Sequence, residues 1–171
     1  WERGHRHLLL TGTSSMVPPA MENDTTIQPY GCAVVRTWRA RGGRVTPQVY
    51  DFAYGTLDWR HPETVLDCLT GADAPTAALS LFDTAAFALQ KLLLERAPEL
   101  AGRCDLIGNA NTPWSQAGHP PIPSLDWNVQ AIAAAASDLI RQLDAREVIA
   151  PCRRLIPPRL VLRTADTPSP Q

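Results

Sequence analysis

The sequence lacks any apolar run long enough to cross a membrane, which takes about 18 consecutive apolar residues. The longest candidate, "VQAIAAAASDLI", is interrupted by Ser137 and Asp138. The amino end, "WERGHRH", has no initiator Met and no apolar segment directly after a basic start, so it is unlike a signal peptide. We therefore expect no membrane partner and a chain that is a piece of something longer.

The chain also lacks an excess of charge of either sign. It has 16 Lys and Arg against 17 Asp and Glu, a formal net charge of −1 at pH 7. That balance gives no bulk attraction to phosphate backbones or anionic lipid. With 171 residues, 44% of them hydrophobic, the chain has enough apolar side chains for one domain or for part of a larger one.

Paired metal ligands and paired thiols are missing as well. The four cysteines, at positions 32, 68, 104 and 152, include no C-x-x-C pair, which argues against a zinc knuckle or a redox dithiol. We expect His5 and His7, at the start of an expected strand, to be surface or interface residues rather than metal ligands. We expect four isolated thiols in a reducing, cytoplasmic compartment and no metal site.

The motifs of common enzyme classes are absent. There is no G-x-S-x-G elbow, no Walker loop, no G-x-G-x-x-G after a strand and no H-E-x-x-H. Asp51, Asp58 and Asp83 are too scattered to form an evident acid–base pair, and "TGTSS" is not followed directly by a helix, as a phosphate loop requires. We expect no enzymatic activity and no cofactor, with an unrecognised α/β enzyme as the remaining alternative.

What the chain does have is an alternation of strand and helix patterns. Short apolar or alternating runs predict strands at 7–12, 47–52, 76–82 and 104–108. Helical spacing with glycine or proline signals predicts helices between them, at 31–43, 61–71 and 84–98. Strands that alternate with helices imply parallel pairing, so we predict an α/β fold: a parallel sheet with helices on both faces.

The pattern changes after residue 108. Residues 112–123 contain four prolines and are predicted to be neither helix nor central strand. A short extended piece at 124–128 precedes a long alanine-rich helix at 129–145. The segment 153–167 is predicted to be extended and interrupted by proline.

Polar residues gather where the expected strands end. Phe82 and Asp83 follow one strand, and Asn109 to Asn111 follow the next in "LIGNANTPWS". Open parallel sheets bind ligands beyond the carboxyl ends of their strands. The asparagine loop is therefore either an ordinary turn or part of a ligand site.

The ordered set of motifs resembles the effector-binding part of LacI/GalR-type transcriptional regulators. "ERGHRHLLLTG" is similar to their G-H-R-R-I-A strand, and "LFDTAAFALQ" to their N-D-x-x-A-x-G junction. "LIGNANTPWS…PPIPSLD" resembles V-G-F-D-D…P-P-L-T-T-V, and "LIPPRLVLRTADT" resembles the closing L-P-x-x-L-V-x-R-x-S-T. The resemblance covers almost the whole chain in the family's order.

This resemblance implies a periplasmic-binding-protein-like fold of two α/β subdomains. Residues 1–126 would then be the carboxyl-terminal subdomain, 127–158 a crossover and helix of the partner subdomain, and 159–171 a returning segment and tail. The implied function is sensing of a small-molecule effector by a homodimeric regulator, with DNA bound only through an absent amino-terminal headpiece. The alternative is a solute-binding protein of a transport system, which shares the fold.

Three positions depart from the family pattern. Gln28 stands where the family usually has an Arg, Phe82 replaces an Asn, and Ala110 falls at the place of an acidic residue. These replacements argue against a standard sugar ligand. They favour a less polar or aromatic effector, or a degenerate pocket.

Two sets of candidate functional residues follow. Asp83, Trp127 and Trp59 are candidates for binding a ligand. The alternative role is a helix cap for Asp83, packing in the hinge for Trp127, and packing in the core for Trp59. A helix as broadly apolar as 84–96 often buries a second face against another subunit, with the core as the alternative. The proposed ligand-binding residues are Gln28, Trp59, Phe82, Asp83, Asn109, Asn111 and Trp127, and the proposed dimer residues are Phe87, Gln90, Lys91 and Leu94.

Overall fold

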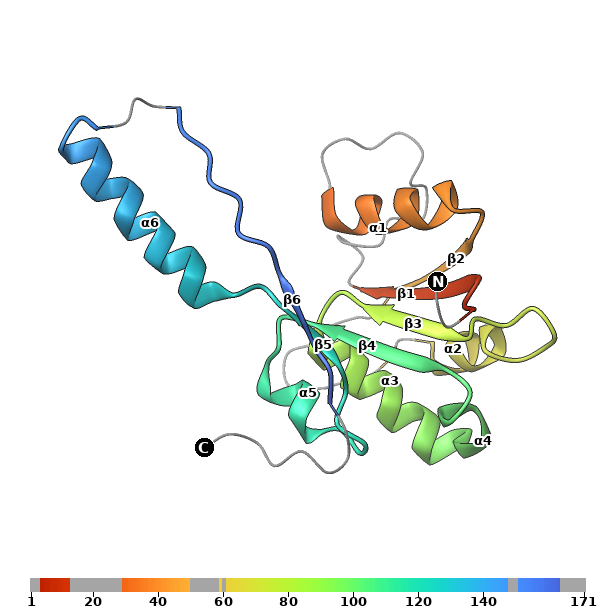
Figure 1. Cartoon of the computed structure of the whole chain (residues 1–171). Helices are drawn as coiled ribbons and strands as arrows, with labels where there is room; N and C mark the ends of the chain where they lie inside the picture. Colours follow the sequence, from red (N-terminus) through yellow and green to blue (C-terminus); the bar gives the residue numbers. More distant parts are fainter. Residues whose placement is uncertain (1–3, 13–28, 50–58, 60, 148–150, 164–171) are drawn as a thin grey trace.

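The fold is a six-stranded sheet with helices on both of its faces, as the sequence predicted (Figure 1). The structure is a computed structural model that describes residues 4–12, 29–49, 59, 61–147 and 151–163. The strand order is β2-β1-β3-β4-β5-β6, in which the first five strands are parallel and β6 is antiparallel to β5.

The four predicted strands all lie side by side in this sheet. β1 is His7–Gly12, β2 is Arg44–Val49, β3 is Ala77–Ser80 and β4 is Asp105–Asn109. Leu9 pairs with Thr46 on one side and Ala78 on the other, and Ala78 pairs with Leu106. The prediction of parallel pairing is therefore confirmed.

β2 begins three residues earlier than predicted, at Arg44, and residues 50–52 lie outside the described part of the chain. Arg44, Val45 and Thr46 pair with the first residues of β1. β2 ends the strand order, and an edge strand tolerates Pro47, because its missing N–H can face away from the ladder.

Helices cover the sheet unequally. α1 (Pro29–Ala40) lies on one face, while α2 (Pro62–Cys68), α3 (Asp83–Arg96), α4 (Pro98–Ala101) and α5 (Pro113–Ala117) lie on the other side (Figure 1). Side chains alternate along each strand, so neighbours enter opposite cores. Leu9 packs with Leu89 and Val65, whereas Leu10 packs with Val35 and Leu81.

Two local predictions were wrong, and a third was confirmed. α5 occupies 113–117 although that segment was expected to exclude helix; Pro113 is in its first turn, where a missing N–H removes no intrahelical bond. The predicted glycine stop of the first helix is confirmed, since α1 ends at Ala40 and Gly42 takes a φ of +77° that turns the chain into β2. Phe82 is the N-cap of α3, so Asp83 is not the capping residue.

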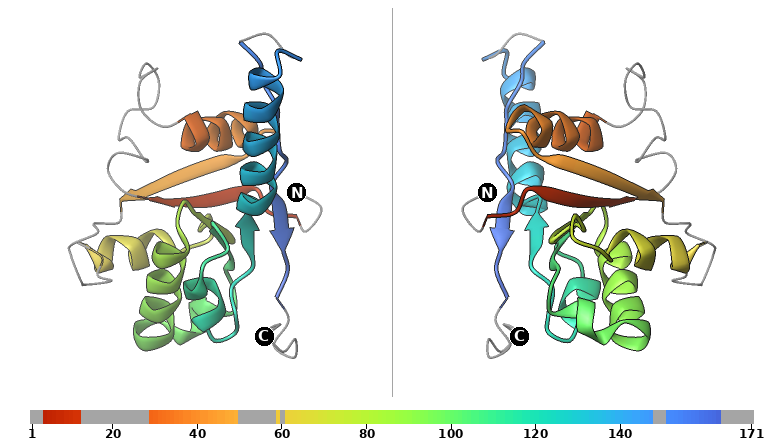
Figure 2. Two further views of the ribbon diagram at one scale, coloured as in Figure 1. Left: turned by 90° about the vertical axis from the view of Figure 1, so that its left-hand side faces the viewer. Right: turned by 90° about the vertical axis from the view of Figure 1, so that its right-hand side faces the viewer.

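The last elements extend away from the sheet. β5 (Ser124–Asp126) leads into α6 (Val129–Asp144), which projects from the sheet, and the chain then returns to form β6 (Arg159–Val161) (Figures 1 and 2). Arg154, in the extended stretch before β6, donates to Asp138 of α6 at 2.8 Å. No residue of α6 is buried, although four of its residues are large and apolar. These exposed residues are Val129, Ile132, Ile140 and Leu143.

Within the described ranges, no helix is long and apolar enough to span a membrane. The four cysteines all lie in that part of the chain and form no disulfide with one another.

Candidate functional site

Most of the predicted ligand residues come together at the carboxyl ends of β3, β4 and β5. Phe82 and Asp83 follow β3, Asn109 ends β4, and Trp127 follows β5. Gln28 lies outside the described residues. Trp59 is 7% exposed and packs in the core with Leu9 and Val65, so the structure does not bring it into this group.

Asn109 and Trp127 are in direct contact. The Trp127 indole Nε1–H donates to Asn109 Oδ1 at 2.8 Å, and Asn109 Nδ2 donates to the Leu81 carbonyl at 3.1 Å. Asn109 is 1% exposed, whereas Trp127 is 46% exposed. A buried amide thus fixes the direction of a half-exposed aromatic ring at the strand ends.

Asp83 is buried and its carboxylate is occupied by neighbouring segments. Oδ1 accepts from the Ser124 hydroxyl at 2.6 Å, and Oδ2 accepts from the Thr112 hydroxyl at 2.9 Å and from the Thr112 backbone N–H. A Cβ at Gly108 would lie 2.1 Å from Asp83 Oδ1, so only glycine allows this approach. Asp83 therefore joins the start of α3 to the ends of β4 and β5.

The residues between β4 and α5 have unusual backbone angles. Ala110 has a φ of +96° and Asn111 a φ of +50°, and positive φ is costly for residues other than glycine. Asn111 N–H donates to Ser124 Oγ at 3.0 Å, and its Oδ1 accepts from the Arg163 guanidinium at 2.5 Å. Asn111 is thus fixed in a left-handed turn.

Arg163 is a residue that sequence reasoning missed. Its Nε donates to the Ile122 carbonyl at 3.1 Å, and one of its terminal nitrogens lies 3.3 Å from Ser115 Oγ. Arg163 is the arginine of the closing motif "LIPPRLVLRTADT", so the sequence could have singled it out. The sequence does not show which residues this arginine contacts. Ser124 and Thr112, which hold Asp83, were also missed.

Asp126, the residue directly before Trp127, forms an ion pair with Arg159. It accepts from the Asn128 backbone N–H at 2.7 Å and from Arg159 at 3.0 Å. The Asn128 N–H first, and then Arg159, hold the pKa of this carboxyl below its usual value, with a smaller contribution from the Asn111 side chain. The carboxylate therefore stays ionised at neutral pH and joins the backbone on the far side of Trp127, at Asn128, to Arg159 of β6.

The predicted dimer residues lie along α3. Phe87 packs against Trp114 of α5 with ring centroids 5.3 Å apart, and Leu94 is 46% exposed. Gln90 is engaged within the chain, since it donates to the Pro120 carbonyl and accepts from His119 N–H. The Lys91 Nζ lies 3.9 Å from Glu95 Oε1, one helical turn later. Trp114, which is 41% exposed, extends this face and was not among the predicted residues.

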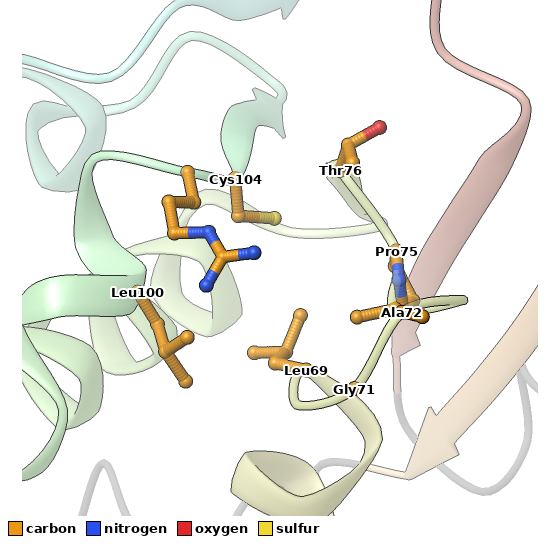
Figure 3. A pocket seen from close by; sticks show the side chains of 9 residues that line it. Leu69, Gly71, Ala72, Pro75, Thr76, Leu100 and Cys104 are labelled. Carbon is orange, nitrogen blue, oxygen red and sulfur yellow. The ribbon is translucent and has the colours of Figure 1, made fainter.

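A small cavity lies at the other end of the sheet, near the starts of β3 and β4 (Figure 3). Burial raises the pKa of the Cys104 thiol to about 12, so it is neutral at physiological pH. None of the predicted site residues lines this cavity. Its lining residues are Leu69, Gly71, Ala72, Ala74, Pro75, Thr76, Leu100, Arg103 and Cys104.

The described residues contain no group of three or more His, Cys, Asp or Glu side chains able to hold a metal ion. The residues at the carboxyl ends of β3, β4 and β5 offer the aromatic surface of Trp127, the amides of Asn109 and Asn111, and the Asp83 carboxylate, which already accepts hydrogen bonds from the protein. Aromatic surfaces combined with a few placed polar groups are typical of small-molecule binding sites.

Comparison with known proteins identifies the fold. The family described as a periplasmic binding protein-like domain matches residues 1–165. A LacI family transcriptional regulator from Arthrobacter sp. FB24 has a TM-score of 0.73 at 20% identity, covering 96% of this chain and 58% of that chain. The same regulator in complex with lactose gives a TM-score of 0.72 at 20% identity, covering 97% and 60%.

The lac repressor dimer bound to operator and an anti-inducer has a TM-score of 0.69 at 16% identity, covering 94% of this chain and 45% of that chain. This chain therefore spans less than two thirds of the length of these regulators. No functionally curated protein matches it in sequence. The chain belongs to the periplasmic binding protein-like domain family and has the fold of the effector-binding domains of LacI-family regulators.

Proposed function

We propose that this chain is the larger part of the effector-binding domain of a LacI-type transcriptional regulator, and that it senses a small neutral molecule without transforming it. The effector lies at the carboxyl ends of β3, β4 and β5, against Trp127 and Phe82. The observation that carries the proposal is the Asn109–Trp127 contact, which holds a half-exposed indole at the ligand-binding edge of a parallel sheet.

The chemistry of the effector follows from which polar groups are already occupied. Asp83 accepts three hydrogen bonds from the protein, and both ends of the Asn109 carboxamide are bonded. A ligand hydroxyl buried without a partner costs about 1–3 kcal/mol. This half of the site therefore favours an effector with an apolar or aromatic face over a polyhydroxylated sugar, although a neighbouring regulator was solved with lactose.

The other half of the site belongs to a second subdomain. We assign 1–126 to the carboxyl-terminal subdomain, 127–158 to the partner subdomain and 159–171 to the returning segment. The exposed apolar residues of α6 support this assignment, since nothing in the described chain buries them. The regulator would be a cytoplasmic homodimer that contacts DNA through a headpiece encoded before this chain.

The proposal is tested by titrating the full-length protein with candidate effectors and following tryptophan fluorescence. Lactose is one probe, and the other is phenyl β-D-galactoside, in which a phenyl ring replaces the glucose unit of lactose and its hydroxyls. We expect a fluorescence change with the aromatic probe that Trp127→Phe removes and that the control Trp38→Phe, on α1, retains. A change that survives Trp127→Phe would place the ligand elsewhere.

The alternative is a solute-binding protein of a transport system. The coding sequence just before this chain distinguishes the two. A helix-turn-helix supports the regulator, whereas a secretory or lipoprotein signal supports the transport protein.

A further inference from the structure

The turn that follows β4 is held in a conformation that its residues do not favour on their own. Ala110 and Asn111 are consecutive and both have positive φ, +96° and +50°. Asparagine tolerates the left-handed region, but alanine at +96° is strained because its Cβ crowds the backbone. Strained residues persist only where the surrounding structure fixes them, and they are concentrated at functional sites.

Three hydrogen bonds fix this turn. Ala110 N–H donates to the Leu125 carbonyl at 2.8 Å, and Asn111 N–H donates to Ser124 Oγ at 3.0 Å. Both come from β5, the neighbouring strand. The third is the bond from the Arg163 guanidinium to Asn111 Oδ1, which is the charged one of the three and comes from a segment more than fifty residues later. A charged donor makes a stronger hydrogen bond than a neutral one.

Arg163 also bonds the segments on either side of the turn. Its contacts to the Ile122 carbonyl and to Ser115 Oγ connect the segment just before β5, and helix α5, to the same guanidinium. The planar fork of arginine can bridge several acceptors at fixed angles, which a lysine ammonium cannot reproduce. Asn109, whose Oδ1 accepts from the Trp127 indole, lies directly before the two positive-φ residues of this turn.

We propose that Arg163 is the positioning residue of the strand-end site. Its guanidinium holds Asn111 and the strained Ala110 in place, and through the adjoining Asn109 it sets the direction of the Trp127 indole. This role rests on the proposed function, in which Trp127 faces the effector. Arg163 does not touch the effector itself.

A purely structural role for Arg163 makes a different prediction. If Arg163 only anchored the returning segment, its loss would lower stability and leave the Trp127 ring where it is. If it holds the strained turn, its loss moves Trp127, and removing the strain at residue 110 reverses that movement. Glycine adopts a φ near +96° without strain, so Ala110→Gly supplies this second perturbation.

The test is fluorine NMR of this chain labelled with 5-fluorotryptophan, without any ligand. The Trp127 signal is assigned with Trp127→Phe, and the signal of the buried Trp59 serves as an internal reference for the core. In Arg163→Gln we expect most of the Trp127 intensity to leave its original position while the Trp59 signal stays. Arg163→Lys, which keeps the charge but not the fork, should cause a smaller displacement of the same signal.

The double variant Ala110→Gly/Arg163→Gln should return most of the Trp127 intensity to its original position. The matched control is Arg154→Gln, which removes another arginine, in the extended stretch before β6, that pairs with Asp138 of α6. It should leave the Trp127 signal unmoved.

Three results would overturn the proposal: an unmoved Trp127 signal in Arg163→Lys, an equal displacement in Arg154→Gln, or no recovery in the double variant. Arg163→Lys keeps the test decisive if Arg163→Gln does not fold. Because the readout needs no ligand, a failure here leaves the proposed effector binding standing, and a failure of effector binding leaves this result standing.

Discussion

At the scale of single residues, the site is built from groups that are already committed to one another. Asp83 and Asn109 are both 1% exposed, and each is bonded to segments outside its own element. Buried polar groups are stable only when their hydrogen bonds are satisfied. The strand ends therefore form a rigid polar frame, and the half-exposed Trp127 is the part of it that a ligand can reach.

Gly108 shows how closely this frame is packed. Gly108→Ala would place a Cβ 2.1 Å from Asp83 Oδ1 and force the buried carboxylate to move. We expect a loss of about 1–3 kcal/mol in the free energy of unfolding, measured by urea denaturation. The matched control, Gly102→Ala, has nothing within 4 Å of the new methyl and should be neutral or stabilising by about 0.4–1 kcal/mol. Equal effects of the two substitutions would contradict the close approach.

The pH dependence of stability has a defined sign at Asp126. The Asn128 N–H and Arg159 hold the pKa of its carboxyl below the usual value in the folded chain. The stability that this contributes is present above the unfolded pKa of about 3.9 and is lost as pH falls through the lower folded pKa. The free energy of unfolding should thus fall below about pH 4.

Asp126→Asn should make that acid-side fall shallower, and Asp138→Asn should do the same, because Arg154 lowers the pKa of Asp138. The double variant should show the shallowest fall, as followed by urea denaturation at a series of pH values. A slope unchanged in Asp126→Asn would show that this carboxylate has no part in the acid response.

At the scale of elements, α3 presents a second apolar surface beside α5. Phe87 and Trp114 pack on each other, and Trp114 and Leu94 are both substantially exposed. Gln90 holds the loop at 119–120, so it shapes this surface from within the chain. Because these exposed apolar side chains lie together, this surface is the one we propose for self-association.

Leu94→Glu should shift the chain toward monomer in equilibrium sedimentation, because it places a charge in the proposed contact. Leu94 is a sharper probe than Phe87, since Phe87→Glu would also break the packing against Trp114 within the chain. The control is Thr37→Glu, at an exposed position of α1 on the opposite face of the sheet, and it should leave the mass distribution unchanged. A wild-type chain that is monomeric at high concentration would refute the contact.

The elements also show what the sequence could predict. The strands β1, β3 and β4 were predicted to within about three residues at each end, because apolar runs bounded by glycine and polar residues identify buried strands. β2 was placed too late because its polar start, Arg44 to Thr46, is paired at a sheet edge. α5 was missed because the rule that proline breaks helices does not hold in the first turn.

For the site, sequence reasoning brought Asn109 and Trp127 together because the carboxyl ends of parallel strands meet at one edge. It could not find Arg163 or Ser124, since their contacts depend on how a distant segment returns antiparallel to β5. It also could not tell that Trp59 is in the core, because a tryptophan near a strand end fits either place.

At the scale of the whole molecule, the sheet and the helices on its faces are well packed, whereas α6 extends away from them and no part of the described chain buries it. The cores on the two faces of the sheet bury residues such as Leu89 and Leu10 completely. α6 buries none of its side chains, yet its residues Ile132, Ile140 and Leu143 have the spacing of a helix face that packs against a partner. We attribute that face to contact with the second subdomain.

This assignment predicts that a charge on α6 matters only in the longer protein. Ile140 is 60% exposed, so Ile140→Asp in this chain alone should change the free energy of unfolding by about 0.5 kcal/mol or less. Leu89→Ala, in the core, should cost about 2–5 kcal/mol and serves as the reference. In a protein extended by the segment encoded before this chain, Ile140→Asp should cost about 1–3 kcal/mol, because it places a charge in a packed contact. Chemical denaturation of both lengths measures the two differences. An equal cost in the two lengths would remove α6 from the subdomain contact, and the exposed face would then need a different partner.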